Sequence, residues 1–110
     1  MLQSLGKVIP TPGTPLRATA SQSDPAARTA CHGVLVQALP TNTGKTYIGT
    51  SAINKTTLQG LHAVLPIPSA SVIPSFSASL AISPNAINVA EIWIDVDNAN
   101  DGVTVSVLVA

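Results

Sequence analysis

The feature that most constrains the fold is a period-two pattern in the last quarter of the chain. Ile92, Ile94 and Val96 alternate with polar or aromatic residues, and valines occupy alternate positions in the run Val103–Val109. Successive side chains of a β-strand point to opposite faces of a sheet, so this alternation predicts two strands. The intervening residues 97–102 are rich in Asp, Asn and Gly, which favour turns. The sequence therefore predicts a terminal β-hairpin around which the rest of the fold closes.

Shorter alternating runs precede this hairpin, separated by connections rich in proline and glycine. We expect strands at 29–39 and 45–50, joined as a hairpin, at 61–67 on a sheet edge, and at 75–80. Helical patterns of about 10–15 residues are absent between these runs, which argues against a parallel sheet with crossover helices. The expected fold is all-β, a small β-sandwich or jelly-roll-like barrel of about seven short strands.

Residues 1–28 differ in character because they contain four prolines, each of which removes a backbone donor and favours extended geometry before it. They are interpreted either as a flexible leader or as an extended arm that packs on a neighbouring subunit. We favour the arm, since a disordered tail does not need apolar side chains. The expected domains are then an arm at 1–28 and a β-domain at 29–110. The candidate contact residues of the arm are Leu2, Leu5, Val8, Ile9, Leu16 and Arg17.

Charge is scarce and unevenly distributed. Only 9% of residues are charged, against about 25% in an ordinary soluble domain. Five bases and one acid lie in the first 55 residues and four acids in the second half, so the halves carry +4 and −4. These charges either make complementary contacts between copies or lie scattered on one solvated surface. The face of the predicted hairpin that bears Glu91, Trp93, Asp95 and Asp97 is a second candidate contact surface.

Two segments resemble ligand-binding loops without matching them. Residues 41–46 end in Gly-Lys-Thr, but a phosphate-binding loop needs glycine where this chain has Leu39, and a helix afterwards. Residues 95–102 resemble a calcium loop, yet Asn100 and Ser106 stand where glycine and a bidentate glutamate belong. We assign neither site. The alternative for the second segment, a non-standard oxygen-ligand site, competes with a plain turn rich in Asn and Asp.

Catalytic and metal-binding patterns are also missing. Cys31 and His32 are adjacent and should face opposite sides of a strand, with Cys31 beside Leu35 and Gln37, so they do not form a zinc site. We interpret Cys31, the only cysteine, as a buried structural residue. A Gly-x-Ser-x-Gly elbow does not occur. We expect no enzyme activity, cofactor or metal; the enzyme alternative is a small hydrolase in which His62 meets a serine and a carboxylate in a cleft.

The residue composition also limits the classes of partner that this chain can bind. Five bases and three aromatic residues do not make the basic, stacking surface that nucleic-acid binding needs. An apolar run of the ~20 residues that a membrane helix requires is not present, and the N-terminus is not a convincing signal peptide. We therefore expect neither nucleic acid nor membrane as a partner, and synthesis in the cytoplasm.

The order of predicted strands and loops in residues 30–110 resembles that of small β-rich virion proteins of tailed bacteriophages. The resemblance rests on residues 33–49, GVLVQALPTNTGKTYIG, on 92–97, IWIDVD, and on 101–107, DGVTVSV. It implies a capsid decoration (cement) protein at the virion surface, made in the host cytoplasm and bound as a homo-oligomer, often a trimer, to the major capsid protein. Alternatives are a small head–tail component, or a carbohydrate- or receptor-binding module of a tail or fibre that uses Trp93 and Tyr47.

Overall fold

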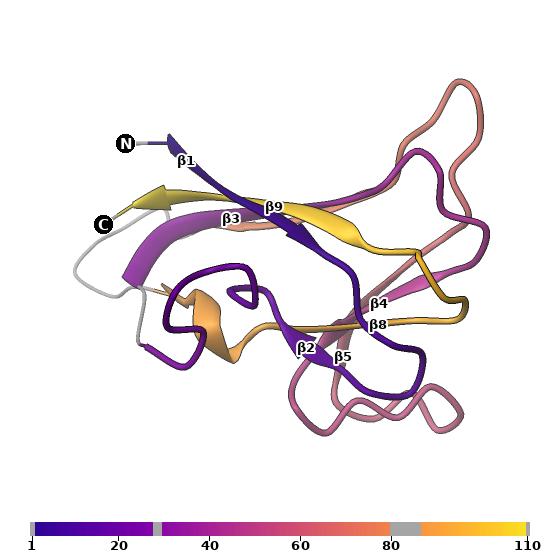
Figure 1. The fold of residues 1–110 in the computed structure, drawn as a ribbon, viewed down its shortest axis with the longest axis horizontal. Coiled ribbons are helices and arrows are strands. Elements are labelled where there is room, and N and C mark those ends of the chain that lie inside the picture. The colour runs from indigo at the N-terminus through magenta and orange to yellow at the C-terminus, as the bar shows by residue number, and fades with distance from the viewer. Residues whose placement is uncertain (1, 28–29, 80–86, 110) are drawn as a thin grey trace.

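The computed structural model describes residues 2–27, 30–79 and 87–109. These residues form nine strands and one short 3₁₀ helix, arranged in two antiparallel sheets (Figure 1). The all-β prediction is thus confirmed. The elements are β1 (Leu2–Val8), β2 (Leu16–Arg17), β3 (Ala30–Ala38), β4 (Thr46–Gly49), β5 (Leu61–Leu65), β6 (Ser75–Ser79), β7 (Ile87–Asn88), η1 (Val89–Glu91), β8 (Trp93–Val96) and β9 (Val103–Val109).

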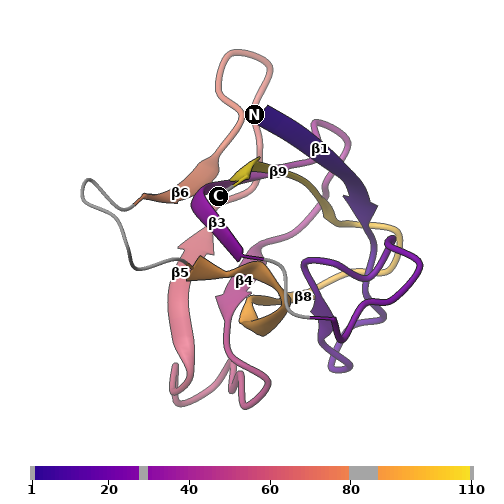
Figure 2. The same cartoon turned by 90° about the vertical axis from the view of Figure 1, so that its left-hand side faces the viewer.

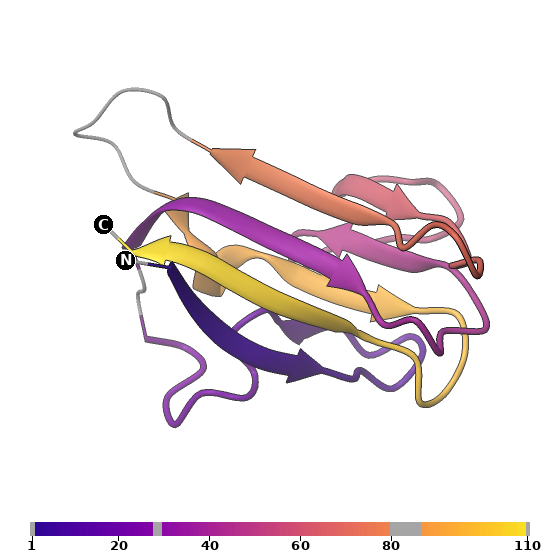
Figure 3. The same ribbon diagram turned by 90° about the horizontal axis from the view of Figure 1, so that it is seen from above.

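The two sheets lie face to face. The five-stranded sheet has the order β1-β9-β3-β6, with β7 also paired to β3, and the four-stranded sheet has the order β2-β8-β4-β5. Figure 3 shows β1, β9, β3 and β6 side by side in that order. The expected edge position of β5 is confirmed, because β5 ends the four-stranded sheet.

One hydrophobic cluster fills the space between the sheets. The alternating valines of β9, Val103, Val105 and Val107, are at most 1% exposed, and Ile94 of β8 is completely buried. On β6, Phe76 and Ala78 pack against this cluster as the alternation predicted; the matching expectation for Leu80 lies outside the described residues. The buried cluster members are Leu5, Val8, Ala18, Cys31, Val34, Val36, Ala38, Ile48, Leu65, Val89, Ile92, Ile94, Val103, Val105 and Val107.

The predicted terminal hairpin is wrong, because β8 and β9 belong to different sheets. The same correction applies to β3 and β4, which were expected to pair and instead lie in opposite sheets. Alternation tells which face of a strand is buried, but it does not tell which strand lies beside it. Both connections cross from one sheet to the other, so the apolar faces of consecutive strands meet across the core.

The segment of residues 2–27 contributes one strand to each sheet. β1 pairs with β9 along its length, and β2 pairs with β8. Leu5, Val8 and Ala18 belong to the hydrophobic cluster. The apolar residues that suggested an arm for a neighbouring subunit are therefore in part core residues of this chain.

A β-bulge in β3 changes the expected position of Cys31. Cys31 pairs with Val109 and Gly33 pairs with Leu108, so His32 is an extra residue in the ladder. An extra residue reverses the alternation on one side of it. Cys31 therefore points into the core, and the prediction that it shares a face with the exposed Leu35 is wrong. Its predicted burial is confirmed, and that burial raises the pKa of its thiol above the ordinary value.

Candidate functional site

An open groove of about 630 Å³ lies beside the end of the four-stranded sheet. The pairing of β2 with β8 places Arg17 directly opposite Trp93 at this groove. Three of the predicted contact residues, Arg17, Glu91 and Trp93, are thus brought together by the fold. The remaining lining residues are Thr50, Ser51, His62, Ile87, Asn88 and Ile92.

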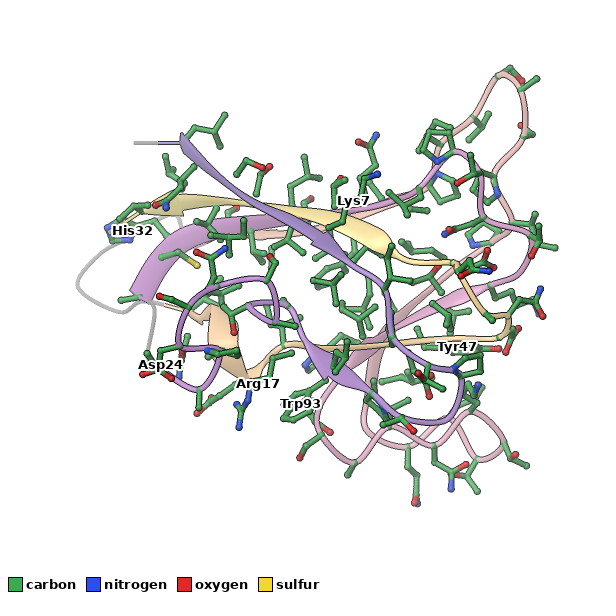
Figure 4. All side chains as sticks on the ribbon, in the orientation of Figure 1. Lys7, Arg17, Asp24, His32, Tyr47 and Trp93 are labelled. Atoms are coloured by element: carbon green, nitrogen blue, oxygen red, sulfur yellow. The ribbon has the colours of Figure 1, made fainter. Side chains whose placement is uncertain are left out.

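Arg17 is held in place before any ligand binds. Its guanidinium carbon lies 4.6 Å from the centroid of the Trp93 ring, a cation–π contact (Figure 4). Arg17 Nη1 also donates a hydrogen bond to the carbonyl oxygen of Ala90 at 2.8 Å, at the end of the groove formed by η1. Asn88 caps this short helix, since its side chain accepts from the Ala90 amide. Preorganised side chains reduce the entropy that binding must otherwise overcome.

The groove has balanced charge and many hydrogen-bonding groups. Arg17 and Glu91 contribute opposite charges, while Thr50 and Ser51 contribute hydroxyl groups. The Trp93 side chain adds a half-buried aromatic surface. An aromatic surface beside a few polar groups is typical of sites that bind small polar ligands. The groove therefore combines both signs of charge and several hydrogen-bonding groups beside one aromatic ring.

The groove also contains the residue types of a hydrolase, but without their arrangement. His62 is the extra residue of a bulge in β5 and is exposed. Within the described part of the chain, neither Ser51 nor Glu91 is hydrogen-bonded to it. A nucleophile and its base need to lie within hydrogen-bonding reach. Among the same residues, no group of three or more His, Cys, Asp or Glu side chains is placed to hold a metal ion.

Asp95 does not belong to a contact surface, contrary to the prediction. It is 2% exposed, and its Oδ1 accepts hydrogen bonds from the backbone amides of Gly13 at 3.0 Å and Val96 at 2.8 Å. The turn at 11–14 covers the outer face of β8 at this point. Sequence alternation correctly placed Asp95 opposite Ile94, but it could not show that a distant turn would cover it.

Asp97 is exposed and belongs to a polar cluster with Tyr47 and Lys55. The Tyr47 hydroxyl donates to Asp97 Oδ2 at 3.1 Å, and Lys55 Nζ lies 3.7 Å from Asp97 Oδ1 and 3.8 Å from Asp95 Oδ2. Lys55 also donates to the carbonyl of Val96 at 2.8 Å. Burial, reinforced by Asp97, raises the pKa of Tyr47 above its ordinary value. Charges from the two halves of the sequence therefore meet within one chain here.

The two segments that resembled ligand-binding loops are bound to each other. Asn42 donates to the carbonyl of Gly102 at 2.8 Å and accepts from the Gly102 amide at 2.9 Å. Asp101 Oδ2 accepts from the amides of Thr43 at 3.1 Å and Gly44 at 2.8 Å. Asn42 and Asp101 are both buried. Their polar side chains join the two crossover connections, which explains their composition without a phosphate or calcium ligand.

The other predicted contact residues of the first segment are divided between core and surface. Leu5 and Val8 are buried in the core, and Leu16 is half-buried against it. Leu2 is 75% exposed and Ile9 is 46% exposed. Among these predicted apolar contact residues, Leu2 and Ile9 are therefore the two that the fold leaves exposed.

Sequence reasoning missed the outer face of the five-stranded sheet. Three rows of side chains cross β1, β9, β3 and β6, and Lys7 provides their only charge. The signal was present in the sequence, because the outward residues between buried ones are uncharged on β9, β3 and β6, and on β1 only Lys7 is charged. Recognising the surface required the strand order. The rows are Leu2, Leu108, Gly33 and Ser79; Ser4, Ser106, Leu35 and Ser77; and Lys7, Thr104, Gln37 and Ser75.

A helix long and apolar enough to cross a membrane does not occur among the described residues. Comparisons gave no further assignment of the groove or the sheet face. No family model, no curated protein and no solved structure matches this chain.

Proposed function

We propose that this chain is a non-enzymatic virion structural protein, a capsid decoration (cement) protein with a β-sandwich or jelly-roll-like architecture. It binds the major capsid protein and copies of itself at the virion surface. The observation that carries the proposal is the neutral outer face of the five-stranded sheet. We call the twelve residues of its three rows the neutral sheet face.

The neutral sheet face is chemically suited to broad contact with another protein. Burying a charge without a partner is costly, and this face carries only Lys7. Serine, threonine and glycine also lose little side-chain entropy on burial, unlike lysine or glutamate. Leu35 is 42% exposed and Leu108 is 46% exposed, so the face contains apolar residues that can be buried against a partner.

The structure changes the mode of binding that the sequence suggested. An arm at residues 1–28 was expected to reach the neighbour, but β1 and β2 are integral to the sheets. Contact through the neutral sheet face replaces the arm in the proposal. β1 contributes to it with Leu2, Ser4 and Lys7.

A charge placed at the centre of the face tests the proposal. Leu35→Arg should reduce co-sedimentation with capsids of the source virion that lack this protein by at least about tenfold, since one buried unpaired charge costs more than the ~1.4 kcal/mol that tenfold represents. Val64→Arg is the matched control, because Val64 is 40% exposed and lies on β5 of the other sheet. Circular dichroism should show that both variants are folded. Equal capsid occupancy for both variants would contradict the proposal.

A second candidate function is favoured by the groove at Arg17 and Trp93, namely carbohydrate or receptor binding in a tail or fibre. Its balanced charge and aromatic wall suit an uncharged sugar. Trp93→Ala should abolish binding on a glycan array while leaving capsid binding intact. Leu35→Arg should reduce capsid binding, if the chain is a decoration protein, and should leave glycan binding unchanged. The two variants therefore separate the two functions.

A further inference from the structure

The two sheets have four edges, and three of them are protected against the addition of another strand. β1 has a bulge at Leu5, and Ser21 and Gln22 donate hydrogen bonds to the Leu5 carbonyl. β2 is only two residues long. β5 has a bulge at His62 and is followed by Pro66. Bulges, short strands and prolines are the devices by which proteins prevent pairing at sheet edges.

The fourth edge, β6, is regular over its five described residues, and the proline beside it, Pro74, lies before the strand. Its five residues pair with β3 in a continuous register, from Ser75 opposite Gln37 to Ser79 opposite Gly33. Its sequence, SFSAS, contains no charge and no proline. Within the described residues, no backbone or side-chain hydrogen bond reaches β6 from any element other than β3. Figure 2 shows β6 at the margin of its sheet.

We propose that β6 is a self-association edge, at which a second copy of this chain adds its own β6 in antiparallel orientation. The pairing joins the two five-stranded sheets into one continuous sheet across a two-fold axis. The inference concerns self-association alone and does not rest on capsid binding. It departs from the trimer implied by the phage resemblance, because an isologous edge pairing closes with two copies.

The register of this pairing follows from the geometry of the strand. Directly opposite residues in an antiparallel pair lie on the same face, so a shift by one residue would turn the partner sheet over. An axis at Ser77 pairs all five residues of β6. A shift by two residues keeps the faces matched but leaves only three of them paired. The register centred on Ser77 therefore makes the most backbone hydrogen bonds.

The side chains are self-complementary in this register. Phe76 lies opposite Ala78 of the second copy, so the large residue is beside the small one on the core side. Serine lies opposite serine at the other three positions. The two-fold axis brings the two copies of Ser77 directly opposite each other, so a charge at this position would meet its own copy. β6 carries no charge at this or any other position, which suits such an axis.

The other edges do not offer an alternative partner for β6. A strand added head-to-tail would need a second regular edge on the same molecule, and the described edges of β1, β2 and β5 are bulged or short. A second β6 is therefore the best-matched occupant that this chain offers.

Light scattering after size exclusion should give twice the 11.2 kDa mass of one chain. Ser77→Lys should give a single-chain mass, because it places two ammonium groups opposite each other across the axis. Ser4→Lys is the matched control, since Ser4 lies in the same row of the sheet on the far edge. It should remain a dimer. Circular dichroism should show that both variants keep the fold.

Cross-linking tests the register independently of these variants. In the proposed pairing the two Ser77 Cα atoms lie about 4.5–5.5 Å apart, within the separation that a disulfide spans. Ser77→Cys should form a covalent dimer on mild oxidation, and Ser4→Cys should not. The unmodified chain should not cross-link either, since its only cysteine, Cys31, is buried.

Single-chain or trimeric mass for the unmodified chain would overturn the inference, as would a dimer that persists in Ser77→Lys. Failure of Ser77→Cys to cross-link would overturn the register. The mass of Leu35→Arg separates this inference from the proposed function. Leu35 lies on β3, inside the sheet and not on the β6 edge, so this variant should remain a dimer whether or not it binds capsids. A dimer that fails to bind capsids keeps the edge pairing, and a single-chain mass for the unmodified chain removes the edge pairing without bearing on capsid binding.

Discussion

Replacing Asn42 with alanine tests whether the two crossover connections hold the sheets together. The Asn42 side chain is 6% exposed and makes three hydrogen bonds, one from the Gly102 amide, one to the Gly102 carbonyl and one, at 3.2 Å, to the Thr46 hydroxyl. The Gly102 carbonyl keeps another donor, the Leu39 amide at 3.0 Å. The Gly102 amide loses its partner and stays buried.

The expected loss of stability follows from these contacts. An unpaired buried amide costs about 1–3 kcal/mol, and each further lost hydrogen bond contributes about 1 kcal/mol or less. Asn42→Ala should therefore lower the free energy of unfolding by roughly 3 kcal/mol, a large part of the ~5–15 kcal/mol that holds a domain of this kind folded. The melting temperature should fall by about 12–18 °C, at roughly 4–6 °C for each kcal/mol.

Urea titration followed by circular dichroism measures this change. The midpoint should shift while the slope stays constant, because the surface exposed on unfolding is unchanged. Thr41→Ala is the matched control, since Thr41 is the exposed neighbour on the same connection and should change stability by less than about 0.5 kcal/mol. A loss below about 1 kcal/mol for Asn42→Ala would refute the role given to the paired connections.

Three further predictions concern pH, packing and the first segment. Burial raises the pKa of Tyr47 above its ordinary 10.0, so the unfolded chain loses this proton first and the free energy of unfolding should fall as pH rises past 10.0. Tyr47 is the only tyrosine, so phenolate absorbance should give a higher pKa in the folded than in the denatured chain. Gly49→Ala should lower the free energy of unfolding by about 3 kcal/mol or more, because the added Cβ would overlap the Gly60 carbonyl oxygen. Gly33→Ala is the control: its added Cβ would have its nearest atom at 3.5 Å, so urea titration should show a loss of less than about 1 kcal/mol. Deleting residues 1–28 should abolish the folded circular dichroism spectrum, because β1 and β2 would be lost; a folded remainder would restore the interpretation of this segment as an arm.

Much of the fold class is readable from residue type and period alone. The alternation in β9 identified a strand with a buried valine face, and each of these valines up to Val107 is buried. The prolines after β5 marked it as an edge strand, and the structure places it at an edge. These features are local, since strand geometry imposes a period of two wherever one face is covered.

The errors concern pairing and coverage, which are not local. The turn residues after β8 suggested a hairpin, but Asp101 instead binds the connection between β3 and β4. The alternation left Asp95 facing outward, and only the fold placed Gly13 over it. Cys31 changed faces because one extra residue entered the ladder, an event that hydrophobic pattern does not record.

For the candidate surfaces too, some residues could be named from the sequence, but their grouping depended on the tertiary structure. Sequence placed Arg17, Glu91 and Trp93 among the contact residues, but the groove that joins them exists only because β2 pairs with β8. The neutral sheet face and the open edge at β6 likewise depend on strand order. What the sequence by itself determined is the all-β class, the buried face of the main strands and the shortage of charge. Tertiary structure alone decided which strands are neighbours, because backbone hydrogen bonds between strands are nearly indifferent to side-chain identity and only packing of the whole core selects among the pairings.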